Sequence, residues 1–203
     1  MGRIEIVEQL RELYRAPSER AQRKQLGALD AHCRAFIALS PFAVLASSSE
    51  DGADATPRGG ERGFVRVQDA HTLLLPDWPG NNRLDSLTNI AENPAVGLLF
   101  LIPGVNETLR VGGTAQIRTD EALLEPFRTG TKLPLTVLVI HVEKAYLHCA
   151  KALMRSKLWD ERAQLGRSTL PSADEILNDQ LGDAAVTPES HEAMEQRYKR
   201  SLY

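Results

Sequence analysis

The sequence predicts a mainly β fold with flanking helices, in which about six strands form a closed or nearly closed β-barrel. Between residues 42 and 148, short apolar or alternating runs are separated by turn residues at the density typical of barrels. Before and after this region, apolar residues recur at helical spacing instead. The chain of 203 residues is also long enough for a full core. We therefore expect a helical segment over residues 1–41 that packs on the barrel, the barrel itself over 42–160, and a helical tail over 161–203.

Two helical patterns precede the barrel. The first starts near Ile4 and is interrupted by Pro17 and Ser18. The second runs through residues 21–37, and Ser40-Pro41 ends it. The chain should thus enter the barrel through two helices.

The strand series begins at Phe42, and the Asp51-Gly52 pair predicts its first hairpin. We count about six strands among the runs FAVLASS, ADATP, GFVRV, TLLLP, AVGLLFLI, TLRVGGTAQIRT and LPLTVLVIHVEKAYLHC. Further helices are indicated by start signals or by periodicity at five places: Asn81-Asn82, Thr119-Asp120, residues 149–159, the capping box from Ser172 to Glu175, and Thr187-Pro188.

Charge balance and hydropathy argue against two classes of partner. With 24 Lys and Arg against 27 Asp and Glu, the net charge of −3 argues against a nucleic-acid surface. The longest apolar runs are far shorter than the roughly 18 residues of a membrane span, and the charged amino terminus lacks the apolar region of a signal peptide. Cys33 and Cys149 give no disulfide framework, and we expect both to be buried. A cytoplasmic protein without nucleic-acid or membrane partners is expected.

A helix entry at Asn82 is a candidate anion site. If the helix begins there, its free backbone N–H groups, the fork of Arg83 and the hydroxyl of Ser86 can meet a terminal phosphate monoester. The alternative is a capped surface helix with a solvated arginine. The glycine-rich turn over residues 59–63 matches neither the dinucleotide-binding nor the P-loop pattern.

The motif Thr56-Pro57-Arg58-Gly59 closes a predicted strand beside that turn. Pro57 favours an edge strand and fixes the direction of Arg58. Thr56 and Arg58 can then donate hydrogen bonds to the edge of a flat polar cofactor. An ordinary surface turn would show the same residues, so both interpretations stay open at this point.

Residues 148–159 hold the densest group of candidate side chains. Lys151 and Arg155 share a helix face without an acidic neighbour, an arrangement that a bound anion would stabilise. His148 and Cys149 lack the second pair of ligands that zinc needs, so no metal site is predicted. We recognise no Ser-His-Asp triad and no pair of catalytic carboxylates. No catalytic residue is therefore assigned, and a cofactor is expected to carry the chemistry.

The motifs occur in one order along the chain, namely Phe42-Ala43-Val44-Leu45-Ala46-Ser47, Asp51-Gly52, Thr56-Pro57-Arg58-Gly59, Asn81-Asn82-Arg83-Leu84-Asp85-Ser86, Asn93-Pro94 and Leu109-Arg110-Val111-Gly112-Gly113. This order resembles the FMN-binding split β-barrels related to pyridoxamine 5'-phosphate oxidase. Residues 148–159 resemble an uncharacterised subgroup of FMN-dependent enzymes in that family. The resemblance implies a six-stranded Greek-key barrel and a homodimer with two FMN molecules in grooves at the subunit interface.

The resemblance also assigns FMN contacts to four groups of residues: Thr56, Pro57, Arg58 and Gly59 along the ribityl chain and the isoalloxazine; Asn82, Arg83 and Ser86 at the phosphate; Thr108 and Arg110 at the flavin edge; and Lys151, Arg155 and Ser156 after the last strand, from this or the other subunit.

Two departures separate the chain from the true oxidase. Asp85 and Ser86 stand where the oxidase has adjacent basic residues for the phosphate, and the tail lacks the oxidase's arginine-histidine substrate motif. The resemblance thus implies a flavoprotein oxidoreductase that transfers hydride through flavin N5 to or from an unidentified small substrate, rather than an oxidase of pyridoxamine phosphate. The alternative is a carrier or sensor that binds FMN or haem without turnover.

Overall fold

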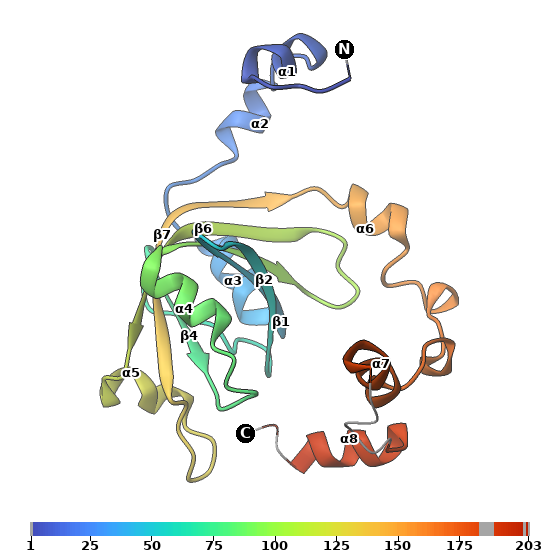
Figure 1. Cartoon of the computed structure of the whole chain (residues 1–203). Coiled ribbons are helices and arrows are strands. Elements are labelled where there is room, and N and C mark those ends of the chain that lie inside the picture. The colour runs from blue at the N-terminus through green and yellow to red at the C-terminus, as the bar shows by residue number, and fades with distance from the viewer. Residues whose placement is uncertain (1, 183–188, 201, 203) are drawn as a thin grey trace.

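The computed structural model of the chain describes residues 2–182, 189–200 and 202 (Figure 1). Its centre is one antiparallel sheet with the strand order β2-β1-β5-β6-β7-β4-β3. The strands are β1 (Phe42–Ser49), β2 (Gly52–Gly59), β3 (Arg66–Val67), β4 (Thr72–Asp77), β5 (Ala95–Leu101), β6 (Thr108–Arg118) and β7 (Thr136–His148). The mainly β class with flanking helices is therefore confirmed.

The strand count differs from the expected six, because the sheet has seven strands. The additional strand, β3, has only two residues. It is short because Gly63 adopts a left-handed φ of 76° and Phe64 N donates to the Glu61 carbonyl, so a turn takes up the start of the predicted run. Along the described chain, β2 and β3 form the two edges of the order and no ladder joins them, so the expected Greek-key closure is not made by backbone pairing.

The helices lie before, between and after the strands. They are α1 (Val7–Leu13), α2 (Glu19–Arg23), α3 (Ala31–Leu39), α4 (Asp85–Glu92), α5 (Glu121–Leu124), α6 (Lys151–Ser156), α7 (Ala173–Leu181) and α8 (His191–Arg200), with 3₁₀ turns at Glu125–Phe127, Glu161–Ala163 and Arg167–Thr169. The predicted capping box at the start of α7 is present, with both of its hydrogen bonds. The predicted start at Thr187-Pro188 lies outside the described residues. None of the described helices is both long and apolar enough to cross a bilayer.

The second amino-terminal pattern, predicted as one helix over residues 21–37, is divided into α2 and α3. Leu26 between them makes an antiparallel bridge to Ala145 of β7, with two backbone hydrogen bonds of 2.9 Å. Asp30 then starts α3, since its side chain accepts from Cys33 N at 2.8 Å, and this hydrogen bond lowers the pKa of Asp30. Tertiary pairing therefore replaces helix where the chain first meets the sheet.

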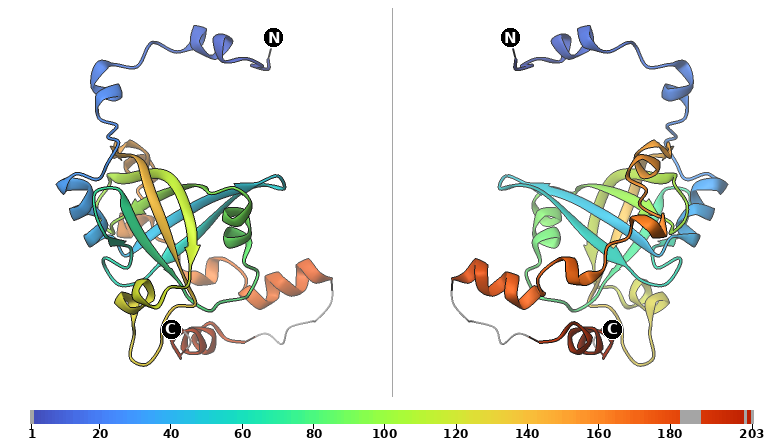
Figure 2. Two further views of the ribbon diagram at one scale, coloured as in Figure 1. Left: turned by 90° about the vertical axis from the view of Figure 1, so that its left-hand side faces the viewer. Right: turned by 90° about the vertical axis from the view of Figure 1, so that its right-hand side faces the viewer.

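The two amino-terminal helices differ from α3 in their burial. Neither α1 nor α2 contains a buried residue, and both extend away from the sheet in Figure 2. Helix α3 buries Cys33 and Ile37 against the main core. Of residues 1–41, it is thus the segment from Leu26 onward that packs apolar side chains on the sheet, and Lys24 ahead of it donates to the Leu147 carbonyl of β7 at 3.1 Å.

The main core lies between the sheet and helices α3 and α4. Alternate residues of β1 point into it, and Leu45 and Phe100 are fully buried there. A smaller cluster joins α5 and the following 3₁₀ turn to β4 and β7; Trp78 packs against it, and its buried members are Leu74, Leu124, Phe127 and Val137. These two clusters fix the strand ends that surround the groove described below.

A β-bulge interrupts the longest ladder of the sheet, between β6 and β7. The register shifts between Gly112 and Gly113. A Cβ atom on Gly113 would lie 1.8 Å from the carbonyl oxygen of His141. The bulge therefore requires a residue without a side chain at position 113.

The two cysteines lie in different environments. Cys33 is buried as predicted, and burial raises the pKa of its thiol to about 11. Cys149 is exposed, so its predicted burial is wrong. The reason is that Cys149 follows the end of β7, beyond the part of the strand that the core covers.

We expect this difference to appear in thiol labelling. At pH 8, only about one in a thousand Cys33 thiols is ionised at that pKa, and the thiolate is the reactive form. Iodoacetamide should therefore label Cys149 rapidly and Cys33 only after denaturation, as read by intact-mass spectrometry. Labelling of both thiols at one rate in the native protein would contradict the burial of Cys33.

Candidate functional site

A groove of about 390 Å³ lies between β2, the end of β4 and the entry to α4. It is lined by two segments that are distant in the sequence: Thr56, Pro57 and Arg58 of β2, and the stretch from Asp77 to Leu87, which contributes every residue except Pro79. Six residues predicted as ligand contacts thus meet in one place. Gly59, the next residue of β2, lines the adjoining cavity.

The inner face of β2 supplies a row of polar side chains. Asp54, Thr56 and Arg58 are partly buried, whereas the residues between them are exposed. Thr56 pairs in register with Leu45, which points into the core, so this row continues the core face of the sheet. Polar groups on a core-facing row need partners, and α4 and β4 supply them.

Two hydroxyl groups join β2 to α4. Ser86 is only 3% exposed, and its Oγ lies 3.0 Å from Thr56 Oγ1. Ser86 also donates to Asp54 Oδ2 at 3.4 Å. Farther along α4, Asn89 donates to Ser47 Oγ at 3.1 Å. These contacts hold the first turns of α4 against the sheet and fix one wall of the groove.

Arg58 is held by a carboxylate from a strand that is not its neighbour in the sheet. Its Nη1 donates to Asp77 Oδ1 at 2.5 Å, and the two side chains are 22% and 14% exposed. The Nε of Arg58 is buried and has no hydrogen-bond partner among the described residues. Since a guanidinium carries five N–H donors in a fixed fork, Arg58 keeps donor capacity for a ligand while Asp77 holds it in place.

The helix entry differs from the prediction. Helix α4 begins at Asp85, not at Asn82, because Asn82 and Leu84 take left-handed φ values of 58° and 60°. Arg83 Nε donates to Asp85 Oδ2 at 2.8 Å, and this contact raises the pKa of the exposed Arg83. Asn82 is therefore not the start of a helix, and the predicted anion site of free helix N–H groups at Asn82 is not present. The backbone N–H of Arg83 instead donates to Asn81 Oδ1.

The charges of the groove are internally compensated. Arg58 is paired with Asp77, and Arg83 with Asp85. Asp54 adds a further carboxylate next to Ser86. A new anion would meet arginines that are already neutralised, whereas a neutral group with hydrogen-bond acceptors would meet hydroxyl and guanidinium donors. The geometry of this part of the groove favours the polar edge of a ring over an isolated phosphate.

Two predicted residues on β6 lie apart from this groove. Thr108 is buried and pairs in register with His148, whose Nδ1 is buried without a partner in the described structure. The guanidinium of Arg110 lies 5.2 Å from the ring centroid of Tyr146, and Lys24 lies at the same distance from that ring. Neither Thr108 nor Arg110 lines the groove of the same chain.

The predicted residues on α6 are also separate from the groove. Lys151 and Arg155 are exposed, and no described carboxylate pairs with either. Ser156 Oγ donates to the Leu153 carbonyl at 3.1 Å. Met154, on the same helix, is 61% exposed. A single chain therefore does not bring α6 to the site.

Three residues of the site were missed by the sequence analysis. Asp54 shares the two-residue period of Thr56 and Arg58, so the alternation along β2 was a usable signal. Asp77 and Trp78 gave no signal in the sequence, because their position beside β2 depends on how strands that are distant in the sheet pack together. Among the described residues, no group of three or more His, Cys, Asp or Glu side chains is arranged to hold a metal.

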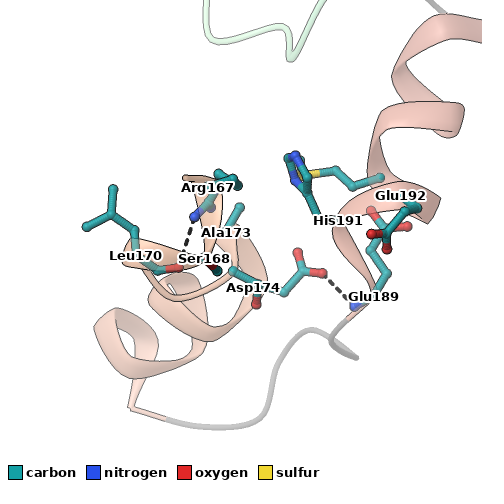
Figure 3. Close-up of a pocket in the computed structure, with 10 residues that line it drawn as sticks. Arg167, Ser168, Leu170, Ala173, Asp174, Glu189, His191 and Glu192 are labelled. Carbon is teal, nitrogen blue, oxygen red and sulfur yellow. Dashed lines mark hydrogen bonds between the residues drawn. The ribbon is translucent and has the colours of Figure 1, made fainter. Parts of the chain in front are cut away.

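Another cavity, of about 340 Å³, lies between α7 and α8 (Figure 3). Its polar groups are used within the tail. Asp174 accepts from the Glu189 backbone N–H at 3.0 Å, and Arg167 donates to the Leu170 carbonyl at 3.0 Å. His191 Nε2 lies 3.2 Å from Oε1 of Glu195, one turn along α8. This network explains the cavity as packing of two capped helices, and the groove beside β2 remains the candidate site.

Comparison with known proteins gives a family match and several similar structures. Group A Streptococcus HupZ is 23% identical, with a TM-score of 0.48, over 59% of this chain and 93% of that chain. General stress protein 26 from Bacillus anthracis is 19% identical, with a TM-score of 0.42, over 57% and 93%. An FMN-binding protein from Syntrophomonas wolfei is 12% identical, with a TM-score of 0.46, over 57% and 83%. No curated protein sequence matches the chain.

The family model described as pyridoxamine 5'-phosphate oxidase matches residues 29–149. The match covers α3 and all seven strands, together with every residue that lines the groove. Because it spans more than half of the chain, the chain belongs to the pyridoxamine 5'-phosphate oxidase family.

Proposed function

We propose that the protein is a cytoplasmic, homodimeric FMN-binding oxidoreductase that acts on a small molecule. The observation that carries the proposal is the buried Arg58 Nε, which has no hydrogen-bond partner among the described residues and belongs to a side chain that lines the groove of a chain from this family. A buried donor of this kind costs stability unless an acceptor meets it. Both described cysteines are free thiols, which supports a reducing compartment.

The residues of the groove fit a flavin better at its ring than at its phosphate. Arg58 and Thr56 offer donors to the acceptor edge of the isoalloxazine, and Ser86 holds Thr56 in position. Pro57 and Gly59 present backbone with little side-chain bulk. Asn82 and Arg83 would hold the phosphate, for which Arg83 has to exchange Asp85 for the ligand. When bound, FMN supplies hydride transfer at N5, and the residues of the chain orient it and shield it from water.

The outer face of β1, β2 and β5 supports the homodimer. Ala46 lies between Ala55 and Gly97 in the cross-strand register, and Val44 lies between Pro57 and Leu99 in the next row. All six residues are exposed or only partly buried. Small and apolar residues in such rows form a smooth surface that a second copy can cover.

A second copy also accounts for the predicted residues that lie away from the groove. Lys151 and Arg155 carry two positive charges without described carboxylate partners, while each groove arginine is already paired. In the proposed dimer, α6 of one protomer contributes these cations, with Ser156, to the FMN phosphate at the groove of the other. Thr108 and Arg110 then lie on the strand that approaches the flavin edge.

The proposal is tested by native mass spectrometry after incubation with FMN. We expect a dimer that carries two FMN molecules and has flavin absorbance. The Lys151→Gln/Arg155→Gln variant should bind FMN about ten-fold more weakly, because a charge-assisted contact to the phosphate is lost. The control is Arg23→Gln/Arg118→Gln, which removes two exposed, paired arginines elsewhere. Protein that takes up no FMN at micromolar concentrations would refute the proposal.

One observation favours a second candidate, a carrier or sensor that holds FMN or another planar ligand such as haem without turnover. Of the described residues that line the groove, none is His, Cys, Lys or Tyr, and its two carboxyl groups, Asp77 and Asp85, are both paired with arginines, which disfavours proton donation by either. Stopped-flow mixing of the flavin-loaded protein with NADH and NADPH separates the candidates. Rapid bleaching of the flavin band supports the enzyme, and a stable band with every donor supports the carrier.

A further inference from the structure

A second cavity continues from the groove on the far side of Trp78. It has a volume of about 340 Å³ and lies between the turn over residues 61–66, the end of β4 and the segment 126–129. A connecting cavity of about 610 Å³ shares Arg58 with the groove and Phe64 with the second cavity, and Trp78 lines all three. A ligand in the second cavity would thus be adjacent to whatever occupies the groove.

The charges of the second cavity, unlike those of the groove, are not compensated. Arg62, Arg66 and Arg128 line it. Arg128 makes two hydrogen bonds of 2.7 Å to Glu125, but neither Arg62 nor Arg66 has a carboxylate partner in the part of the chain that the structure describes. Counting Glu61, which also lines the cavity, three guanidinium groups face two carboxylates. The surplus of one positive charge matches a singly charged anion.

The two unpaired arginines are carried by a braced segment. Arg66 pairs in register with Leu74 of β4, and its guanidinium lies 5.3 Å from the ring centroid of Phe127. The turn that carries Arg62 is held to the end of α3, since Gly63 N donates to the Ser40 carbonyl at 3.2 Å. Backbone fixed in this way reduces the entropy lost when a ligand binds.

Aromatic and apolar groups form the remaining walls. Phe64 and Trp78 are partly buried and belong to the margins of the two core clusters. Pro76 is buried beside them. Flat side chains and guanidinium forks in one cavity are the complement of a ring that bears a carboxylate.

We infer that this second cavity binds a small ring compound with one carboxylate group, whose carboxylate meets Arg62 and Arg66 and whose ring packs against Trp78. Identifying this ligand as the substrate rests on the function proposed above, because the ligand could exchange hydride only with a flavin bound in the groove. Binding of the ring compound itself requires the residues of the second cavity and does not require FMN.

The experiment uses Trp78 fluorescence. The chain contains two tryptophans, so Trp159→Phe leaves Trp78 as the reporter. In this background we titrate benzoate, its neutral analogue benzamide, and the doubly charged phenyl phosphate, each with and without FMN. Benzoate should quench Trp78 and bind at least ten-fold more tightly than benzamide.

The arginine variants test the carboxylate contact. Arg62→Gln and Arg66→Gln should each lower the affinity for benzoate about ten-fold, as expected for loss of a charge-assisted hydrogen bond. Arg118→Gln, an exposed and paired arginine elsewhere, should not.

Equal affinity for benzoate and benzamide, or unchanged affinity in both arginine variants, would overturn the inference. Tighter binding of phenyl phosphate than of benzoate would overturn the choice of a carboxylate. Thermal melting followed by circular dichroism establishes that each variant is folded. Benzoate binding without FMN uptake would refute the proposed function but support the carboxylate site in the second cavity. FMN uptake without benzoate binding would refute the carboxylate site alone.

Discussion

Replacing Gly113 with alanine is expected to lower the free energy of unfolding by about 3 kcal/mol, at the upper end of the cost of overpacking a core. The new Cβ would lie 1.8 Å from the His141 carbonyl oxygen and 2.9 Å from its carbon. Both are backbone atoms in the central ladder between β6 and β7, so relief requires the strands to separate at the bulge. Urea unfolding followed by circular dichroism measures the change.

The neighbouring glycine provides the control. A Cβ on Gly112 would lie 2.4 Å from Lys144 Cε, but this atom is near the end of an exposed, flexible side chain that can rotate away. Gly112→Ala should therefore cost less than about 1 kcal/mol. Similar losses in the two variants would show that general strand propensity, and not the backbone contact at position 113, determines the effect.

Replacing Arg58 with methionine is expected to have the largest effect on the candidate site. The variant leaves the carboxylate of Asp77, 14% exposed, without its partner, which should cost about 2 kcal/mol of stability after allowance for partial exposure. FMN affinity should fall about 100-fold, because Arg58 also carries the Nε donor that no described residue satisfies. Thermal unfolding and FMN titration measure the two effects separately.

A double-mutant cycle separates the two roles of Arg58. Asp77→Asn combined with Arg58→Met removes the unpaired charge, so most of the lost stability should return while FMN affinity stays low. Recovery of both properties in the double variant would show that Arg58 only supports the fold. Recovery of neither would show that the ion pair is not what couples β2 to β4.

The class of the fold could be predicted because burial along the strands follows the sequence pattern. Alternation along β1 and the continuous apolar run of β4 each match their position in the sheet. The break between α2 and α3 was not predicted, although Gly27 and the helix cap at Asp30 allow it; the bridge from Leu26 to Ala145, which accompanies the break, depends on a strand distant in the sequence. Local propensity is a weak signal where a tertiary partner competes for the same backbone groups.

The candidate site was predictable in part for the same reason. Thr56 and Arg58 lie on one strand, so their common orientation follows from local geometry. The predicted start of α4 at Asn82 was wrong. Asparagine is a favoured helix cap, but it also tolerates the left-handed conformation that Asn82 adopts here. Asp77 reaches Arg58 across strands that are not neighbours, and no local pattern encodes such a contact.

The position of Pro57 within β2 has a consequence for how copies of the chain can aggregate. β2 is an edge strand, and the free edge of a sheet is where another chain can add in register and extend the sheet toward a fibril. Proline has no backbone N–H to donate, and Pro57 lies in the middle of the strand. Propagation by strand addition is therefore interrupted along this edge of the sheet.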